Sequence, residues 1–123
     1  MTRRTRTRRR RSARHRRSSS AAFLASGLCY AANCALGAAV ATRLIDTRRF
    51  RWVHHALYIA TVSTTILALV AGIRGDRRAA LTLSPALVPL AVIPYTGTHT
   101  RRHPLIALTA APFIVAGVVT SRR

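Results

Sequence analysis

Hydrophobic residues occur along the chain in four long blocks that are separated by short arginine-bearing segments. The blocks cover residues 21–42, 52–73, 79–98 and 104–120, and none of them contains Asp, Glu, Lys or Arg. A helix of 22 residues, the length of the first two blocks, is about 33 Å long, and the hydrocarbon core of a bilayer is about 30 Å thick. The pattern therefore predicts an all-α, polytopic integral membrane protein with a bundle of four transmembrane helices.

The segment before the first block is polar and strongly basic. Residues 1–20 contain ten arginines and no periodic apolar residue, so their like charges repel one another. We predict a disordered, Arg-rich N-terminal tail over residues 1–20 and a transmembrane domain over residues 21–123. A cleaved signal peptide is the alternative, because Ala39, Val40 and Ala41 form a small-residue cleavage pattern. The first block is longer than a signal core of about 7–15 residues, which favours a retained span.

The arginines between the blocks predict the orientation in the membrane. With the N-terminus inside, the inner side carries fifteen arginines and the outer side six. Loops rich in Lys and Arg stay in the cytoplasm. Arginine in place of lysine is the bias of a GC-rich bacterial genome. The prediction is a multi-pass protein of the bacterial cytoplasmic (inner) membrane, with both termini in the cytoplasm.

Prolines predict where two of the helices are irregular. Pro85, Pro89 and Pro94 each remove a backbone donor from the third span, which we expect to be kinked or partly unwound. In the fourth span, Pro104 suits a first helical turn and Pro112 an interior kink. The carbonyls freed by proline are either satisfied by neighbouring helices or open to a substrate or ion, as in broken transporter helices.

Polar and small residues recur along one side of each of the first two spans. In the second span they are spaced by four, three, four, three and four: His54, Tyr58, Thr61, Thr65, Ala68 and Gly72. The first span has a matching series: Ser26, Tyr30, Asn33 and Gly37. Small residues and cross-helix hydrogen bonds make helix interfaces in a bilayer, so we predict that these two seams face each other. The alternative is that Ser26, Tyr30, Asn33, Tyr58, Thr61 and Thr65 line a polar path.

Four of the five histidines fall on the predicted outer face: His54, His55, His99 and His103. Neutral imidazole binds transition metals and haem iron, so a metal or haem site built from these residues is one hypothesis. Adjacent His54 and His55 diverge by about 100° on a helix, and no cysteine or carboxylate lies near them in sequence. The favoured interpretation is that they are interfacial polar residues beside Trp52, and no cofactor is predicted.

Composition removes most catalytic chemistry from consideration. The formal net charge is +19, and the only acidic residues are Asp46 and Asp76, which the topology puts on opposite sides of the membrane. They cannot form a carboxylate pair, and no Ser-His-Asp spacing or phosphate-binding glycine loop is present. Cys29 and Cys34 read as buried, reduced thiols. The sequence therefore favours a protein that is not an enzyme.

The tail and the size of the chain predict the partners. Arginines near an anionic leaflet gain about 1 kcal/mol each, so lipid headgroups are the expected ligands of Arg8, Arg9, Arg10, Arg11, Arg14, Arg16 and Arg17. Specific nucleic-acid binding is not expected, because residues 1–20 contain no aromatic that would stack on bases. Four short helices enclose little volume, so another membrane protein or self-association is expected. We predict a non-enzymatic accessory or structural membrane subunit, with a small oligomeric transporter or channel as the alternative.

Overall fold

The computed structural model describes residues 3–42, 44, 51–95 and 102–123, and the side chains of residues 3–9, 11, 51, 102 and 103 are outside the description. Within these residues the chain is helical, without a strand. The α-helices are α1 (Arg3–Ala41), α2 (Arg51–Gly75), α3 (Arg77–Leu83), α4 (Leu87–Val92), α5 (Arg102–Thr109) and α6 (Ala111–Arg122). Two 3₁₀ turns, η1 (Ser84–Ala86) and η2 (Ile93–Tyr95), flank α4.

In the described part of the chain, four helical segments are long and apolar enough to cross a membrane. They are Ser12–Ala41, Trp52–Gly75, Arg77–Tyr95 and Pro104–Arg122. Each overlaps one predicted span, and the end of the third predicted span, residues 96–98, lies outside the described residues. The prediction of an all-α chain with four helices long and apolar enough to span a membrane is confirmed.

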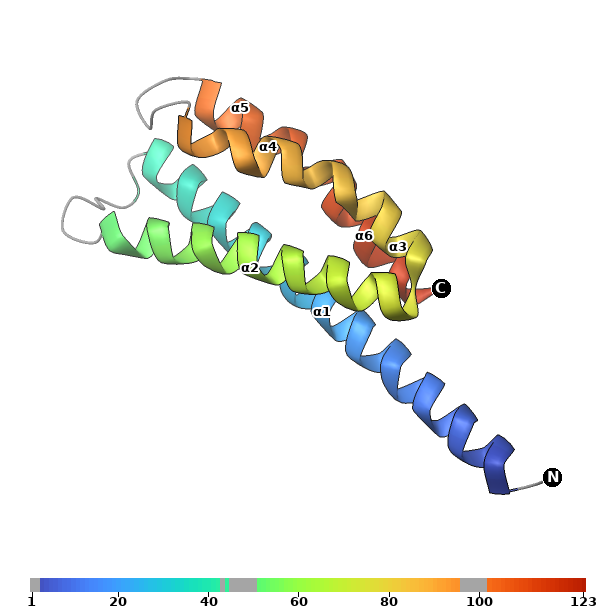
Figure 1. Ribbon diagram of the computed structural model, residues 1–123. Helices are drawn as coiled ribbons and strands as arrows, with labels where there is room; N and C mark the ends of the chain where they lie inside the picture. The colour runs from blue at the N-terminus through green and yellow to red at the C-terminus, as the bar shows by residue number, and fades with distance from the viewer. Residues whose placement is uncertain (1–2, 43, 45–50, 96–101) are drawn as a thin grey trace.

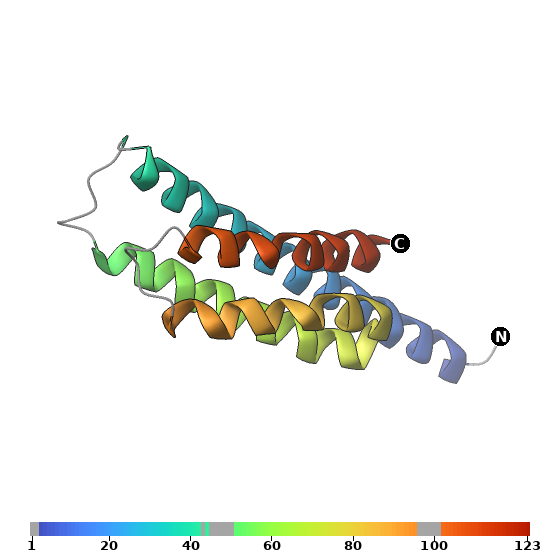
Figure 2. The same cartoon turned by 90° about the horizontal axis from the view of Figure 1, so that it is seen from above.

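The four segments lie side by side as an elongated bundle (Figures 1 and 2). Helix α1 lies along α2 and also contacts α6, while α3 packs against both α2 and α6. The N-terminal part of α1 projects beyond the bundle, at the end where the α2–α3 turn and the C-terminus lie (Figure 1). The start of α2, the end of α1 and the start of α5 lie at the opposite end.

The basic segment is helical, whereas the sequence predicts a disordered tail. Residues 3–20 are helical and continuous with the first span. Neither glycine nor proline occurs before Gly27, and arginine and alanine have high helix propensities. Since extending an existing helix costs much less than nucleating a new one, the span provides the nucleus and the arginines continue it.

A short charged turn separates α2 from α3, at one of the arginine-bearing segments between the apolar blocks. Asp76 is the N-cap of α3, and its Oδ1 accepts a hydrogen bond of 3.1 Å from the backbone N–H of Ala79. The Asp76 N–H donates in turn to the carbonyl of Gly72, at 2.7 Å. Asp76 therefore satisfies a free donor at the start of α3 while it ends α2.

The helix breaks occur at prolines. Pro85 lies in η1 and Pro94 in η2, so the third span alternates between α-helical and 3₁₀ turns. In the fourth span, Ala110 separates α5 from α6, and Pro112 lies in the first turn of α6. The predicted irregularity of both spans is confirmed, because each proline lacks the N–H that would continue the helical ladder.

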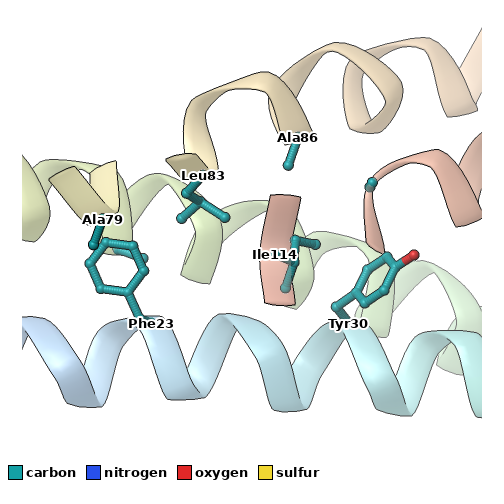
Figure 3. Packing of buried hydrophobic residues seen from close by; sticks show 8 residues of the cluster. Phe23, Tyr30, Ala79, Leu83, Ala86 and Ile114 are labelled. Carbon is teal, nitrogen blue, oxygen red and sulfur yellow. The ribbon is translucent and has the colours of Figure 1, made fainter. Parts of the chain in front are cut away.

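The core is a narrow cluster in which a few large side chains pack against small ones (Figure 3). Its large members are Phe23, Tyr30, Leu83 and Ile114, and its small members are Ala68, Ala79, Ala86 and Ala110. Phe23 from α1 lies under α3, and Ile114 from α6 lies between Leu83 and Tyr30 (Figure 3). Alanine on the facing helices gives these large side chains room, so the helices approach closely.

Candidate functional site

The polar seams of α1 and α2 meet at one buried pair of hydroxyl groups. Ser26 Oγ and Thr65 Oγ1 are 2.8 Å apart, and both side chains are fully buried. The Thr65 hydroxyl has a single hydrogen and lies 2.8 Å from the carbonyl of Thr61, to which it donates. Ser26 is therefore the donor to Thr65, and the predicted contact between the two seams is present at this level.

One to two turns from this pair, the tyrosines of the two seams form hydrogen bonds with other helices and not with each other. Tyr58 donates from its hydroxyl to the carbonyl of Leu90 in α4, at 2.8 Å. Tyr30 donates to the carbonyl of Ala107 in α5, at 2.7 Å. The seams thus point toward the centre of the bundle, and each one contacts two neighbouring segments.

Two carbonyls that prolines leave without a helical donor accept hydrogen bonds from side-chain hydroxyl groups. Leu90 is four residues before Pro94, so no backbone N–H can complete that turn, and the Tyr58 hydroxyl takes its place. Leu81 is four residues before Pro85, and its carbonyl accepts a 3.0 Å hydrogen bond from Ser84 Oγ. The predicted satisfaction by a neighbouring helix holds for the Leu90 carbonyl, whereas the Leu81 carbonyl is satisfied by a serine of its own span.

Removing the Tyr58 hydroxyl is therefore expected to destabilise the bundle. Tyr58→Phe keeps the ring but leaves the Leu90 carbonyl without its donor, and we expect a loss of about 1–2 kcal/mol of unfolding free energy. The measurement is unfolding in mixed micelles of mild detergent and SDS. The control is Tyr95→Phe, at a ring that is 89% exposed, and equal losses in the two variants would contradict the assignment.

Two serines of the predicted tail, Ser19 and Ser20, belong to the bundle. Ser19 is 2% exposed, and its hydroxyl lies 3.1 Å from the Ala71 carbonyl in α2 and 2.9 Å from the His15 carbonyl. Ser20 donates to the carbonyl of Ser121 in α6, at 2.8 Å. The signal was present in the sequence, because Ser19 and Phe23 continue the three-and-four spacing of the α1 seam upstream from Ser26.

Asn33 is the seam residue with an unsatisfied atom. Its Oδ1 is buried and, among the described side chains, has no hydrogen-bond partner. Four residues further along α1, a Cβ added to Gly37 would meet no atom within 4 Å. A buried amide oxygen without a donor is costly, so Asn33 is a weak point in the packing of α1.

The histidines of the predicted metal site are only partly described. His54 is half-buried and His55 is exposed, both in the first turns of α2. His103 belongs to α5, whose start lies at the same end, but its side chain is outside the description, and His99 lies outside the described residues. Among the described side chains, no group of three or more His, Cys, Asp or Glu could hold a metal ion. The metal or haem site stays a prediction.

The two cysteines lie in the bundle, and the described arginines of the basic segment lie on its surface. Cys29 and Cys34 are free and partly buried, and Cys34 packs against the core cluster. The described arginines of the basic segment are all exposed: Arg10, Arg14, Arg16 and Arg17. The side chains of Arg8, Arg9 and Arg11 are outside the description.

Taken together, the described polar groups of the interior are hydroxyls and one amide, and most of them fasten one helical segment to another. Seryl and tyrosyl hydroxyls donate to carbonyls of other segments, as at Ser20, Tyr30 and Tyr58. This arrangement can hold helices together in an apolar solvent, where such bonds replace hydrophobic attraction. Comparisons of the chain with protein-family models, with curated proteins and with solved structures found no match.

Proposed function

We propose that the protein is a structural or accessory subunit that packs against another span in the cytoplasmic membrane. The observation that carries this proposal is the open surface of α1. In an apolar stretch of 18 residues of the first span, only 11% is buried within the bundle, whereas 33% of the corresponding stretch of the third span is buried. The first span therefore has the most surface left for a partner.

The composition of that surface favours a protein partner over lipid. In the outer half of the span, the exposed residues Ala31, Ala35 and Ala38 share one side of the helix. Most exposed residues of α2 are large by contrast, among them Ile59, Ile66, Leu67 and Ile73. Small side chains let another helix approach closely, so the alanine face of α1 suits helix packing.

The basic part of α1 supports an additional contact with anionic lipid. Ser20 is attached to the bundle by its hydrogen bond to Ser121. At 1.5 Å per residue, Arg17 lies about 4.5 Å and Arg14 about 9 Å beyond Ser20 along the helix axis. That range corresponds to the headgroup layer if the bundle spans the hydrocarbon core. Anionic phosphates there would neutralise these exposed arginines.

Arginine placement supports an orientation with both termini in the cytoplasm. The helical extension of α1, the α2–α3 turn and the C-terminus lie at one end of the bundle (Figure 1). These segments contain most of the arginines in the sequence. Anionic inner-leaflet lipids and the retention of basic loops both favour this end as the cytoplasmic one.

Photocrosslinking in native membranes tests the packing role. Cys29 and Cys34 are first replaced by alanine, and single cysteines at positions 31, 35 or 38 are then labelled with benzophenone maleimide. We expect illumination to yield an adduct of defined mass, either a dimer of the chain or a complex with another membrane protein, because the alanine face is in contact with a second helix.

The matched control is Leu67→Cys in the same background, at an exposed position of α2 that has large neighbours. It is expected to give lipid adducts and little protein adduct. If positions 31, 35 and 38 crosslink no more protein than position 67, the packing role of α1 is refuted.

A further inference from the structure

A groove lies between α2 and α3 on the side of the bundle near the charged turn. Its volume is about 360 Å³, and it is lined by Leu69, Ile73, Arg77, Ala80, Leu81 and Ser84. Four of these residues are apolar. Ser84 is polar, but its hydroxyl already donates to the carbonyl of Leu81. The wall is therefore apolar except for one cationic residue, Arg77.

The order of the residues gives the groove a polar and an apolar end. On the third span, Arg77, Leu81 and Ser84 follow the i, i+4, i+7 positions of one helix face, and this row extends about 10 Å from the turn. On α2, Leu69 and Ile73 are one turn apart and form the facing wall. Arg77 is thus at the turn, and the apolar lining extends from it toward the middle of the bundle.

The charge around the polar end is complementary to a phosphate. Arg74, Arg77 and Arg78 are all exposed at the turn. The one acidic residue of the turn, Asp76, has its Oδ1 engaged as the N-cap of α3. A guanidinium binds phosphate oxygens through two parallel hydrogen bonds, which is the geometry that arginine supplies better than lysine.

We infer that this groove binds one anionic glycerophospholipid, with the phosphate at Arg77 and an acyl chain along Leu69, Ile73 and Leu81. A cationic mouth beside an apolar channel between two spans fits a lipid, because a soluble anion would leave the apolar wall uncovered. The inference rests on the proposed membrane location. It does not depend on the partner at the alanine face of α1.

Retention of lipid by the purified full-length chain tests the inference. The protein in mild detergent is mixed with equal amounts of dioleoyl phosphatidylglycerol and dioleoyl phosphatidylcholine, and bound lipids are counted by mass spectrometry of the intact complex. Wild-type protein is expected to retain one phosphatidylglycerol in preference. Arg77→Gln should lower that preference about fivefold, which corresponds to ~1 kcal/mol.

The matched control is Arg78→Gln, which removes the same charge from the neighbouring residue of the same turn, outside the groove lining. Its effect should stay below about twofold, because solvent and salt screen a charge that does not contact the lipid. Equal effects of the two substitutions would overturn the site. Variants are compared at matched helix content, measured by circular dichroism.

Two further arms separate the groove from other phosphate-binding surfaces. Replacing the seven arginines from Arg8 to Arg17 by glutamine should lower total lipid binding but keep the difference between Arg77→Gln and Arg78→Gln. Loss of that difference would assign the lipid to the basic part of α1 and overturn the inference. Dihexanoyl phosphatidylglycerol, which has the same headgroup and short chains, should be retained less by the wild type; equal retention would indicate a phosphate site without a role for the groove.

Discussion

Phe23→Ala is expected to cause the largest loss of stability of any single substitution in the core. Phe23 is fully buried and packs against α2, α3 and α6, where its ring approaches Gly72 and Gly117. Truncation of a buried phenylalanine costs about 3–5 kcal/mol in soluble proteins. We expect about 3 kcal/mol here, because in a bilayer the loss is mainly packing, without a large transfer term.

Unfolding in mixed micelles, with the free energy extrapolated to zero SDS, measures this loss. The control is Leu28→Ala on the same helix, where the side chain is 62% exposed. It should change the unfolding free energy by less than about 0.5 kcal/mol, as is usual for exposed sites. Similar losses in the two variants would show that the region around Phe23 is not a packed core.

Gly72→Ala is the second substitution with a large expected effect. A Cβ at this position would lie 2.9 Å from the Ala80 Cβ and 2.9 Å from the Phe23 Cζ. Neither neighbour can move freely, since both are buried where α1, α2 and α3 converge. Overpacking of this kind costs about 1–3 kcal/mol, and we expect α2 to move away from its neighbours.

Gly37→Ala is a matched control for this substitution, because a Cβ there would meet nothing within 4 Å. It should leave stability unchanged or raise it slightly, since alanine favours a helix more than glycine does. Both variants are measured by the same SDS titration. A neutral Gly72→Ala would show that the helices around Phe23 are farther apart than the structure has them.

The two substitutions are also expected to be coupled. Phe23→Ala removes two of the three atoms that a Cβ at position 72 would meet, the ring atoms Cζ and Cε2 of Phe23. Gly72→Ala should therefore cost less in the Phe23→Ala background than in the wild type, because the two residues share one packing contact. Strict additivity would mean that the contact with Ala80 alone accounts for the cost.

The alanine face of α1 and the α2–α3 groove have different physical bases. The first is a small-residue surface in the C-terminal half of α1, formed by Ala31, Ala35 and Ala38. The second is an apolar channel with Arg77 at its mouth, near the other end of the bundle. A helix fits the first because small side chains allow close approach, and a lipid fits the second because charge and apolar surface lie end to end.

The basic segment shows where composition is misleading as a guide to local structure. High charge density predicts disorder in a free chain, because such a chain cannot bury enough apolar surface to offset its entropy. Residues 3–20 are instead attached to a helix of membrane-spanning length, and Ser19 and Ser20 hydrogen-bond to α2 and α6. The helix nucleus and the partners of these two serines lie outside the basic segment, so its composition does not reveal them.

By itself, the sequence determined the features that depend on residues near one another in the chain. Apolar runs of spanning length, the turn at Asp76 and the irregularities at Pro85, Pro94 and Pro112 follow from local hydropathy and backbone chemistry. The same is true of the seams, whose three-and-four spacing puts polar residues on one side of a helix whatever its neighbours are.

Tertiary structure alone decided what each seam contacts. Ser26 bonds to Thr65 as the matching seams predict, but Tyr58 donates to α4 and Tyr30 to α5. Spacing defines the side of a helix that is polar, whereas the partner depends on the order and distance of the helices in the bundle. The groove at Arg77 arises in the same way, because its two walls belong to different helices and exist only when these pack together.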